Sequence, residues 1–170
     1  MIDRTIPVWN VIKAWATGDL DIMMDQLTDD AVFENVPMDP IVGKAAIRAA
    51  NGAHLAMCDR APWKVFNIAV NEETKTVLTE RLDVFVLKDG RTVYAPSMGA
   101  WVVNDESKIT LWRDYFDLAS WNRQMGVAPD LASGEGCLRF SSSRQQVIPT
   151  CVNYDPRAHW RRPMVMMRQG

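Results

Sequence analysis

The chain has 170 residues, of which 48% are hydrophobic and 24% are charged, as is typical of one globular domain with its own core. The formal net charge of −2 does not suggest nucleic acid or an anionic membrane as a partner, and no apolar run is long enough to span a bilayer. The three cysteines match neither a disulfide framework nor a zinc site, and the N-terminus lacks a signal-peptide apolar segment. We therefore expect a cytoplasmic protein in a reducing compartment.

The charge is unevenly distributed along the chain. Residues 1–138 carry a net charge of −7, whereas residues 139–170 carry +5 and belong to a stretch rich in proline and serine. We accordingly divide the chain into a domain at 1–126 and a loop-rich basic C-terminal extension at 127–170. We expect this extension to serve as a lid or as a strap across a dimer, because it also holds apolar residues suited to packing.

The first part of the chain favours helices. Apolar residues at helical spacing predict a helix over 4–17, and Asp19 can cap a second, short helix over 20–28. The stretch AVFENV at 31–36 is typical of a short strand ended by the prolines that follow it. An alanine-rich helix is predicted next, over 44–57.

The second part favours strands joined by tight turns. Alternating apolar residues predict four of them, and Asp89-Gly90 is a hairpin signal. The predicted strands span 63–70, 75–87, 92–103 and 108–117, and a short helix follows over 118–126. This order predicts an α+β fold in which a curved mixed or antiparallel sheet wraps around the N-terminal helices and forms a conical pocket.

Charged residues interrupt two of these strands on the face that should be buried. Asp114 shares a strand face with Trp112 and Phe116, and Arg81 and Asp83 share a face of the strand over 75–87. A buried carboxylate is costly unless it is paired or takes part in chemistry. One guanidinium cannot neutralise two buried carboxylates, so one of them should hold a proton near neutral pH.

Such a set would supply one acid and one base, and Asn35 in the strand over 31–36 could orient a water molecule on the base. A purely structural alternative has similar weight at this point: Arg81 and the two aspartates could form a buried ion-pair group that fixes strand register. The spacing alone does not show that the three strands bring these residues together.

The motifs FENVP at 33–37, ERLDVF at 80–85 and ITLWRDYFDL at 109–118 resemble those of the limonene-1,2-epoxide hydrolase family. The similarity extends over about residues 5–125, and the family has the SnoaL-like, cystatin-like α+β barrel, or cone, fold. The resemblance implies a cofactor-independent and metal-free epoxide hydrolase. It also implies a small apolar epoxide as substrate. We expect a homodimer that packs through its curved sheet.

The resemblance also implies a role for each polar residue. Asp114 would be the general base that activates water, Asp83 the general acid that protonates the epoxide oxygen, and Arg81 the bridge between them, with Asn35 holding the water. The family has a tyrosine where this chain has Phe33, and one lost hydrogen bond costs on the order of 1 kcal/mol. Tyr94 is a candidate for a substitute hydroxyl.

The pocket walls and the competing functions are less closely defined by the sequence. Phe33, Met38, Leu55 and Trp112 are the candidate substrate-binding residues. A ketosteroid-isomerase or polyketide-cyclase activity would need a tyrosine hydroxyl in the pocket. A dehydratase would need His54. A non-catalytic protein that binds apolar ligands would need none of the charged residues, and burying them in its pocket would cost free energy without a function.

Overall fold

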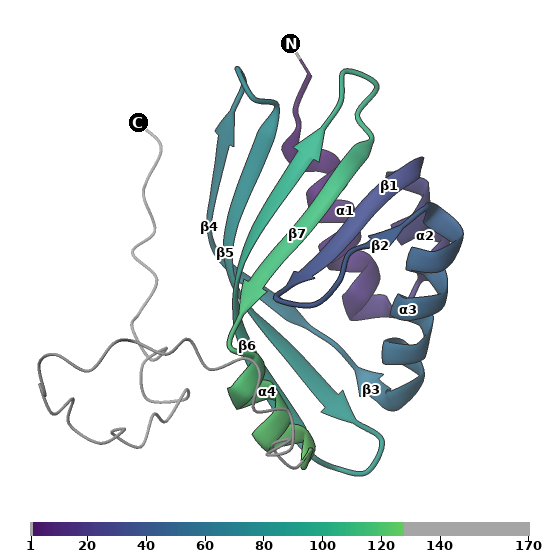
Figure 1. The fold of residues 1–170 in the computed structure, drawn as a ribbon, viewed down its shortest axis with the longest axis vertical. Coiled ribbons are helices and arrows are strands. Elements are labelled where there is room, and N and C mark those ends of the chain that lie inside the picture. Colours follow the sequence, from purple (N-terminus) through teal and green to yellow (C-terminus); the bar gives the residue numbers. More distant parts are fainter. Residues whose placement is uncertain (1, 128–170) are drawn as a thin grey trace, which may run out of the picture. The chain divides into compact units, whose positions relative to one another are not determined.

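The computed structural model describes residues 2–127 and contains four helices and seven strands within that range (Figure 1). The helices are α1 (Thr5–Thr17), α2 (Leu20–Asp25), α3 (Lys44–Met57) and α4 (Leu118–Met125). The strands are β1 (Leu27–Val36), β2 (Ile41–Val42), β3 (Cys58–Arg60), β4 (Trp63–Asn71), β5 (Thr76–Leu87), β6 (Thr92–Val103) and β7 (Ile109–Phe116). Most of the predicted C-terminal extension at 127–170 lies outside the described residues.

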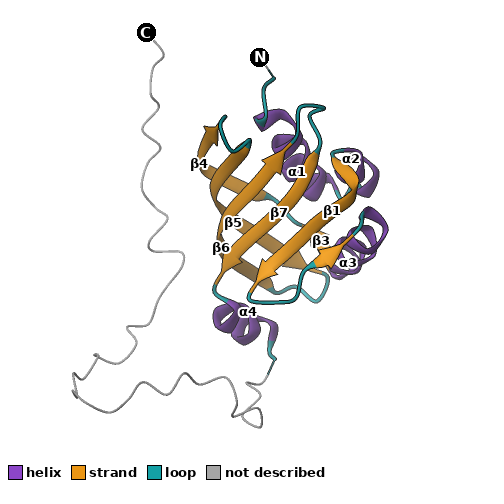
Figure 2. Cartoon of the chain, turned by 45° about the horizontal axis from the view of Figure 1, so that its top comes forward, coloured by secondary structure: helices purple, strands orange, loops and turns teal. Residues whose placement is uncertain are grey.

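The seven strands form one curved, unclosed sheet in the order β2-β1-β7-β6-β5-β3, with β4 also paired to β5. The pair of β1 with β7 is parallel and the other pairs are antiparallel, so the sheet is mixed. Figure 2 shows α1, α2 and α3 behind one face of the sheet, so within the described residues these three helices leave the opposite face uncovered. The predicted α+β fold with a curved sheet around the N-terminal helices is confirmed.

Local sequence signals account for the boundaries of the N-terminal helices. Gly18 ends α1 with a left-handed backbone (φ +71°), a conformation that glycine adopts without strain. The Asp19 side chain then accepts hydrogen bonds from the backbone N–H groups of Asp21 and Ile22 and so caps α2. Because α2 ends at Asp25, the chain enters β1 at Leu27, four residues before the predicted start of that strand at Ala31.

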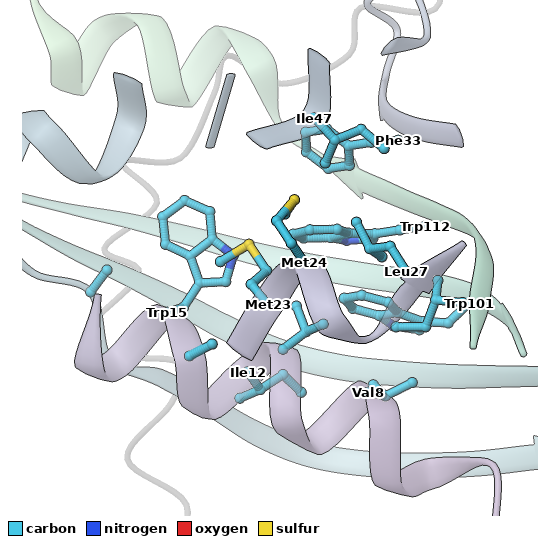
Figure 3. Packing of buried hydrophobic residues seen from close by; sticks show 14 of the residues in the cluster. Val8, Ile12, Trp15, Met23, Met24, Leu27, Phe33, Ile47, Trp101 and Trp112 are labelled. Atoms are coloured by element: carbon cyan, nitrogen blue, oxygen red, sulfur yellow. The ribbon is translucent and has the colours of Figure 1, made fainter. Parts of the chain in front are cut away.

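The core lies between the helices and the concave face of the sheet. Trp101 of β6 and Trp112 of β7 stack with ring centroids 4.8 Å apart. Figure 3 shows the two rings next to each other. Side chains of α1 and α2, including Val8, Trp15 and Met23, close the other side of this core. Among the described residues no helix is both long and apolar enough to cross a membrane.

Candidate active site

A cavity of about 180 Å³ opens between the concave face of the sheet and helices α1, α3 and α4. Aromatic and polar side chains line it together: Trp15, Phe33, Asn35, Met38, Asn51, His54, Trp63, Asp83, Phe85, Ala95, Ser97, Trp112, Asp114, Phe116, Leu118, Trp121 and Asn122. Both predicted catalytic carboxylates are among them. Strand periodicity thus correctly predicts that Asp83 and Asp114 lie on the face of the sheet that lines the cavity.

Arg81 bridges these two carboxylates. Its Nε donates to Asp83 Oδ1 at 2.8 Å, and its Nη2 lies 2.6 Å from Asp114 Oδ2. Arg81 is 0% exposed, and Asp83 and Asp114 are each 5% exposed. Removal of either partner would leave a buried charge without compensation, so the three residues form one electrostatic unit.

The guanidinium of Arg81 is enclosed by Thr79, Gly99, Trp63 and Trp101. Thr79 Oγ1 accepts from Arg81 Nη1 at 3.0 Å and from Trp101 Nε1 at 3.1 Å. The rings of Trp63 and Trp101 lie 4.7 and 5.4 Å from the guanidinium carbon, within the range of cation–π attraction. A Cβ on Gly99 would lie 2.3 Å from Arg81 Nη1, so only glycine allows this close approach.

Asp114 has one bonded and one free carboxylate oxygen. Oδ2 accepts from Trp112 Nε1 at 2.8 Å and also faces Arg81. Oδ1 is buried and has no hydrogen-bond partner among the residues that the structure describes. Asn35 pairs with Asp114 in the parallel register of β1 and β7, which brings its amide beside this carboxylate. The free oxygen and the amide can therefore act on the same small molecule.

Asp83 holds its proton more tightly than an ordinary aspartate does. Burial raises the pKa of Asp83 to about 6, since the attraction of Arg81 is offset in part by the negative charge of Asp114. Burial would lower the pKa of Arg81, but Asp114 and Asp83 outweigh it and raise that pKa above its ordinary value. The guanidinium thus stays charged while Asp83 titrates near neutral pH.

The structure separates the predicted wall residues. Phe33, Met38 and Trp112 line the cavity, and the Phe33 ring packs 4.4 Å from that of Trp112. Leu55 instead packs against the core from α3 and is not among the described lining residues.

Tyr94 does not supply the substitute hydroxyl. Strand alternation buries its neighbours Val93 and Ala95 on the inner face of β6, which turns Tyr94 to the opposite face. The cavity lining within residues 2–127 contains no tyrosine.

Several residues of the site were not identified from the sequence. Asn51 lines the cavity from α3 and was not predicted. His54 lines it from the same helix, whereas the sequence suggested it only as a residue that a dehydratase would need. Thr79 could have been found, because it alternates onto the same face of β5 as Arg81. Gly99 carries a second signal, since a glycine inside a strand often marks a close approach by another group.

Comparison with known proteins identifies the family. The model of the limonene-1,2-epoxide hydrolase catalytic domain matches residues 3–125. The chain belongs to the limonene-1,2-epoxide hydrolase family. The match includes Arg81, Asp83 and Asp114, and it agrees with the resemblance seen in the sequence motifs.

Relatives in this family and beyond it support the assignment of family and fold. Epoxide hydrolase EphG from Mycobacterium tuberculosis is 32% identical over 111 residues, which cover 63% of this chain and 68% of that protein. The structure of an LEH-like epoxide hydrolase from M. tuberculosis is similar with a TM-score of 0.60 and 29% identity, over 71% of this chain and 87% of the other. A Δ5-3-ketosteroid isomerase from Mycobacterium sp. shares the fold, with a TM-score of 0.64 and 16% identity over 70% and 97% of the two chains. The limonene-1,2-epoxide hydrolase family domain here is thus a cone fold of the ketosteroid-isomerase type.

Proposed function

We propose that this protein is a cofactor-independent epoxide hydrolase that adds water in one step to a largely apolar epoxide and gives a vicinal diol. The observation that carries the proposal is the buried bridge from Arg81 to both Asp83 and Asp114 at the wall of the cavity. Family membership supports the reaction class. The aromatic lining supports an apolar substrate, because such surfaces gain most by burying hydrocarbon.

The two carboxylates take different roles in this reaction. Asp114 Oδ1, which has no partner among the described residues, takes a proton from water as the water oxygen bonds to an epoxide carbon. The carbon–oxygen bond of the ring breaks, and Asp83 donates its proton to the leaving oxygen. The raised pKa of Asp83 supports its assignment as the acid. Arg81 keeps both carboxyl groups in place throughout.

Phe33 leaves fewer groups to hold the attacking water. Asn35 and Asp114 are neighbours in the sheet and are the groups we assign to this task. The Phe33 ring contributes an apolar surface against Trp112 instead of a hydroxyl. We expect Phe33→Tyr to increase turnover if the new hydroxyl reaches the water, by roughly tenfold for one well-placed hydrogen bond.

Hydrolysis of a small epoxide panel in ¹⁸O-labelled water tests the proposal. Limonene oxide, cyclohexene oxide and styrene oxide are suitable probes, with Asp114→Asn and Asp83→Asn as variants. We expect wild-type protein to form diol and both variants to lose nearly all turnover while they keep their circular dichroism spectra. Label in the diol from a single-turnover run would show direct attack by water. Near-native turnover by either variant would refute the role of that aspartate.

Arg81→Lys tests the bridge itself. A lysine keeps the charge but lacks the planar set of N–H donors with which a guanidinium can bond two carboxylates, so we expect a severe loss of turnover. An unchanged rate would show that charge alone is enough and would exclude the bridging role.

The isomerase and cyclase alternative has less support in this cavity. Such chemistry would use a tyrosine hydroxyl as an oxyanion donor, and the described lining provides none. The non-catalytic alternative does not account for three buried charges beside the cavity.

A further inference from the structure

A second polar region lies in the cavity wall formed by α3. Asn51 is 1% exposed and lines the cavity, and its Nδ2 donates to the backbone oxygen of Ile47 at 2.9 Å. Because that carbonyl can only accept, this bond identifies the nitrogen end of the amide. Asn51 Oδ1 is therefore a buried acceptor, and it has no hydrogen-bond partner among the described residues. A buried acceptor without a donor is unfavourable, which points to a ligand or solvent donor.

His54 lies nearly one helical turn beyond Asn51 on the same face of α3. It lines the cavity, and its ring lies 6.5 Å from Trp15, 6.4 Å from Phe85 and 5.9 Å from Trp121. No hydrogen bond or ion pair joins this ring to another residue within the described part of the chain. Burial lowers the pKa of His54, so its neutral ring offers one donor and one acceptor.

This region is distinct from the residues that carry the proposed reaction. The His54 ring packs 6.4 Å from the ring of Phe85, which lies two residues beyond Asp83 and so about 6–7 Å further along β5, away from Arg81. Trp15 Nε1, on a ring next to His54, is a further buried donor without a partner among the described residues. The cavity thus combines an acid–base end with a separate wall of unpaired donors and acceptors.

A hydroxyl group matches this wall better than other simple substituents. It donates one hydrogen bond and accepts others, whereas a hydrocarbon does neither. A carboxylate has no hydrogen to give to Asn51 Oδ1, and an ammonium group has no lone pair for a ring N–H. The hydroxyl also adds no charge to a cavity that already holds two carboxylates.

We propose that the α3 wall binds a hydroxyl group on the carbon skeleton of the substrate, whose O–H donates to Asn51 Oδ1 and whose oxygen accepts from the His54 ring N–H. This inference rests on the proposed function and narrows its substrate class to epoxy alcohols. The epoxide lies at Asp83 and Asp114, and the hydroxyl lies at the other end of an otherwise apolar skeleton.

Matched pairs of substrates test this inference. The probes are terminal epoxides with a hydroxyl at the far end of a six-, eight- or ten-carbon chain, each compared with its methyl ether, which keeps the oxygen but cannot donate. We expect wild-type protein to prefer the alcohol at one chain length by about tenfold or more in kcat/KM, as is usual when a site built to bond a hydroxyl meets an analogue that lacks it. Equal kcat/KM values for alcohol and ether at all three lengths would overturn the inference.

Two variants and one control locate the preference. Asn51→Leu removes the acceptor with little change in shape, and His54→Phe removes the donor, so we expect each to reduce the alcohol-to-ether ratio of kcat/KM. Ala53→Leu, on the exposed side of the same helix, should keep the wild-type ratio. If Asn51→Leu lowered kcat equally for alcohol and ether, Asn51 would act on the attacking water and the inference would fall.

Ligand binding separates a failure of this inference from a failure of the proposed function. Tryptophan fluorescence, to which Trp15, Trp63 and Trp121 contribute from the cavity wall, would report the binding of saturated alcohols and their methyl ethers. If no epoxide were opened but alcohols bound more tightly in an Asn51-dependent way, the hydrolase proposal and the epoxy-alcohol substrate class would fall, and only hydroxyl binding at the α3 wall would stand. Turnover without any alcohol preference would overturn the inference alone.

Discussion

Two aspartates on one arginine acquire different properties from the atoms around them. Asp83 bonds Arg81 Nε, whereas Asp114 faces Nη2 and also accepts from Trp112 Nε1. Burial raises the pKa of Asp83 to about 6, because the attraction of Arg81 offsets the cost of burying the charged carboxylate only in part and the neighbouring Asp114 adds to that cost. This raised pKa supports the proposed role of Asp83 as the acid.

The pH dependence of kcat/KM tests this division. Because the acid must be protonated and burial raises the pKa of Asp83 to about 6, we expect kcat/KM to fall as pH rises through about 6. Hydrolysis of styrene oxide measured between about pH 4.5 and about pH 8 would show this alkaline limb. A rate that stayed level across that interval would contradict the role of Asp83 as acid.

The free energy of unfolding should also depend on pH because of the raised pKa of Asp83. The native state binds a proton at Asp83 more tightly than the unfolded state does, so this group stabilises the fold most at low pH. Its contribution is lost as pH rises from about 4 to about 6. Urea unfolding of the wild type and of Asp83→Asn should show a fall over this interval that the variant lacks. A steeper fall in the variant would contradict the raised pKa.

A substitution at Gly99 tests whether turnover depends on the exact position of the Arg81 guanidinium. A Cβ at this position would lie 2.3 Å from Arg81 Nη1, 2.6 Å from Thr79 Oγ1 and 2.7 Å from Trp101 Nε1. Gly99→Ala should therefore displace the guanidinium and lower kcat/KM by roughly a hundredfold, since small errors in position are costly in catalysis. Gly52→Ala is the control, because its Cβ would meet only the flexible end of Leu20 at 3.2 Å. Near-native kcat/KM in Gly99→Ala would show that catalysis does not depend on the exact position of the Arg81 guanidinium.

At the scale of elements, strand periodicity predicts which side chains share a face but not which strands are neighbours. Alternation correctly assigned Arg81, Asp83 and Asp114 to the buried face. The parallel pairing that brings Asn35 beside Asp114 joins segments almost eighty residues apart, and no local signal specifies it. Strands β2 and β3 were missed because they have two and three residues and exist only through their partners.

The N-cap of α2 offers a test of an element outside the site. Asp19 Oδ1 accepts from the backbone N–H groups of Asp21 and Ile22 at 3.0 Å each. Asp19→Ala should lower the free energy of unfolding by about 1 kcal/mol, measured by urea denaturation, and leave kcat/KM unchanged. Asp25→Ala, at the other end of α2, removes an unfavourable charge from a helix C-terminus and should be neutral or slightly stabilising. Equal losses in both variants would argue against capping.

At the scale of the whole molecule, the aromatic side chains do two tasks at once. Trp63, Trp101 and Trp112 pack in the core or line the cavity, and they also contact Arg81 or Asp114. A tryptophan in a strand pattern is usually a packing residue, and that interpretation leaves out the polar N–H of the indole. The α3 wall was missed for a related reason, since Asn51 sits in an alanine-rich helix whose pattern marks no polar site.

The open face of the sheet bears on the predicted homodimer. Leu78, Met98 and Tyr115 are 45%, 50% and 48% exposed on this face, which α1, α2 and α3 leave uncovered (Figure 2). Met98 of β6 lies directly between Glu80 of β5 and Tyr115 of β7 in the strand register, so these three side chains form one row. Leu78 lies beside this row, two residues from Glu80 on the same face of β5. A second copy of the chain that packed its own row against this one would bury the apolar side chains of both.

Sedimentation velocity tests this arrangement. Wild-type protein at tens of micromolar should sediment as a dimer, and Met98→Lys should raise the dimer dissociation constant by about a hundredfold, because each subunit would bring a charged ammonium group into the apolar part of the interface. Ile22→Lys is the matched control: Ile22 is 46% exposed but lies on α2, on the helical side of the sheet, so the variant should remain dimeric. A wild-type monomer, or a Met98→Lys protein that dimerised like the wild type, would show that this face is not the interface. Because Met98 faces away from the cavity, a monomeric Met98→Lys protein that kept its epoxide turnover would further show that one subunit holds a complete site.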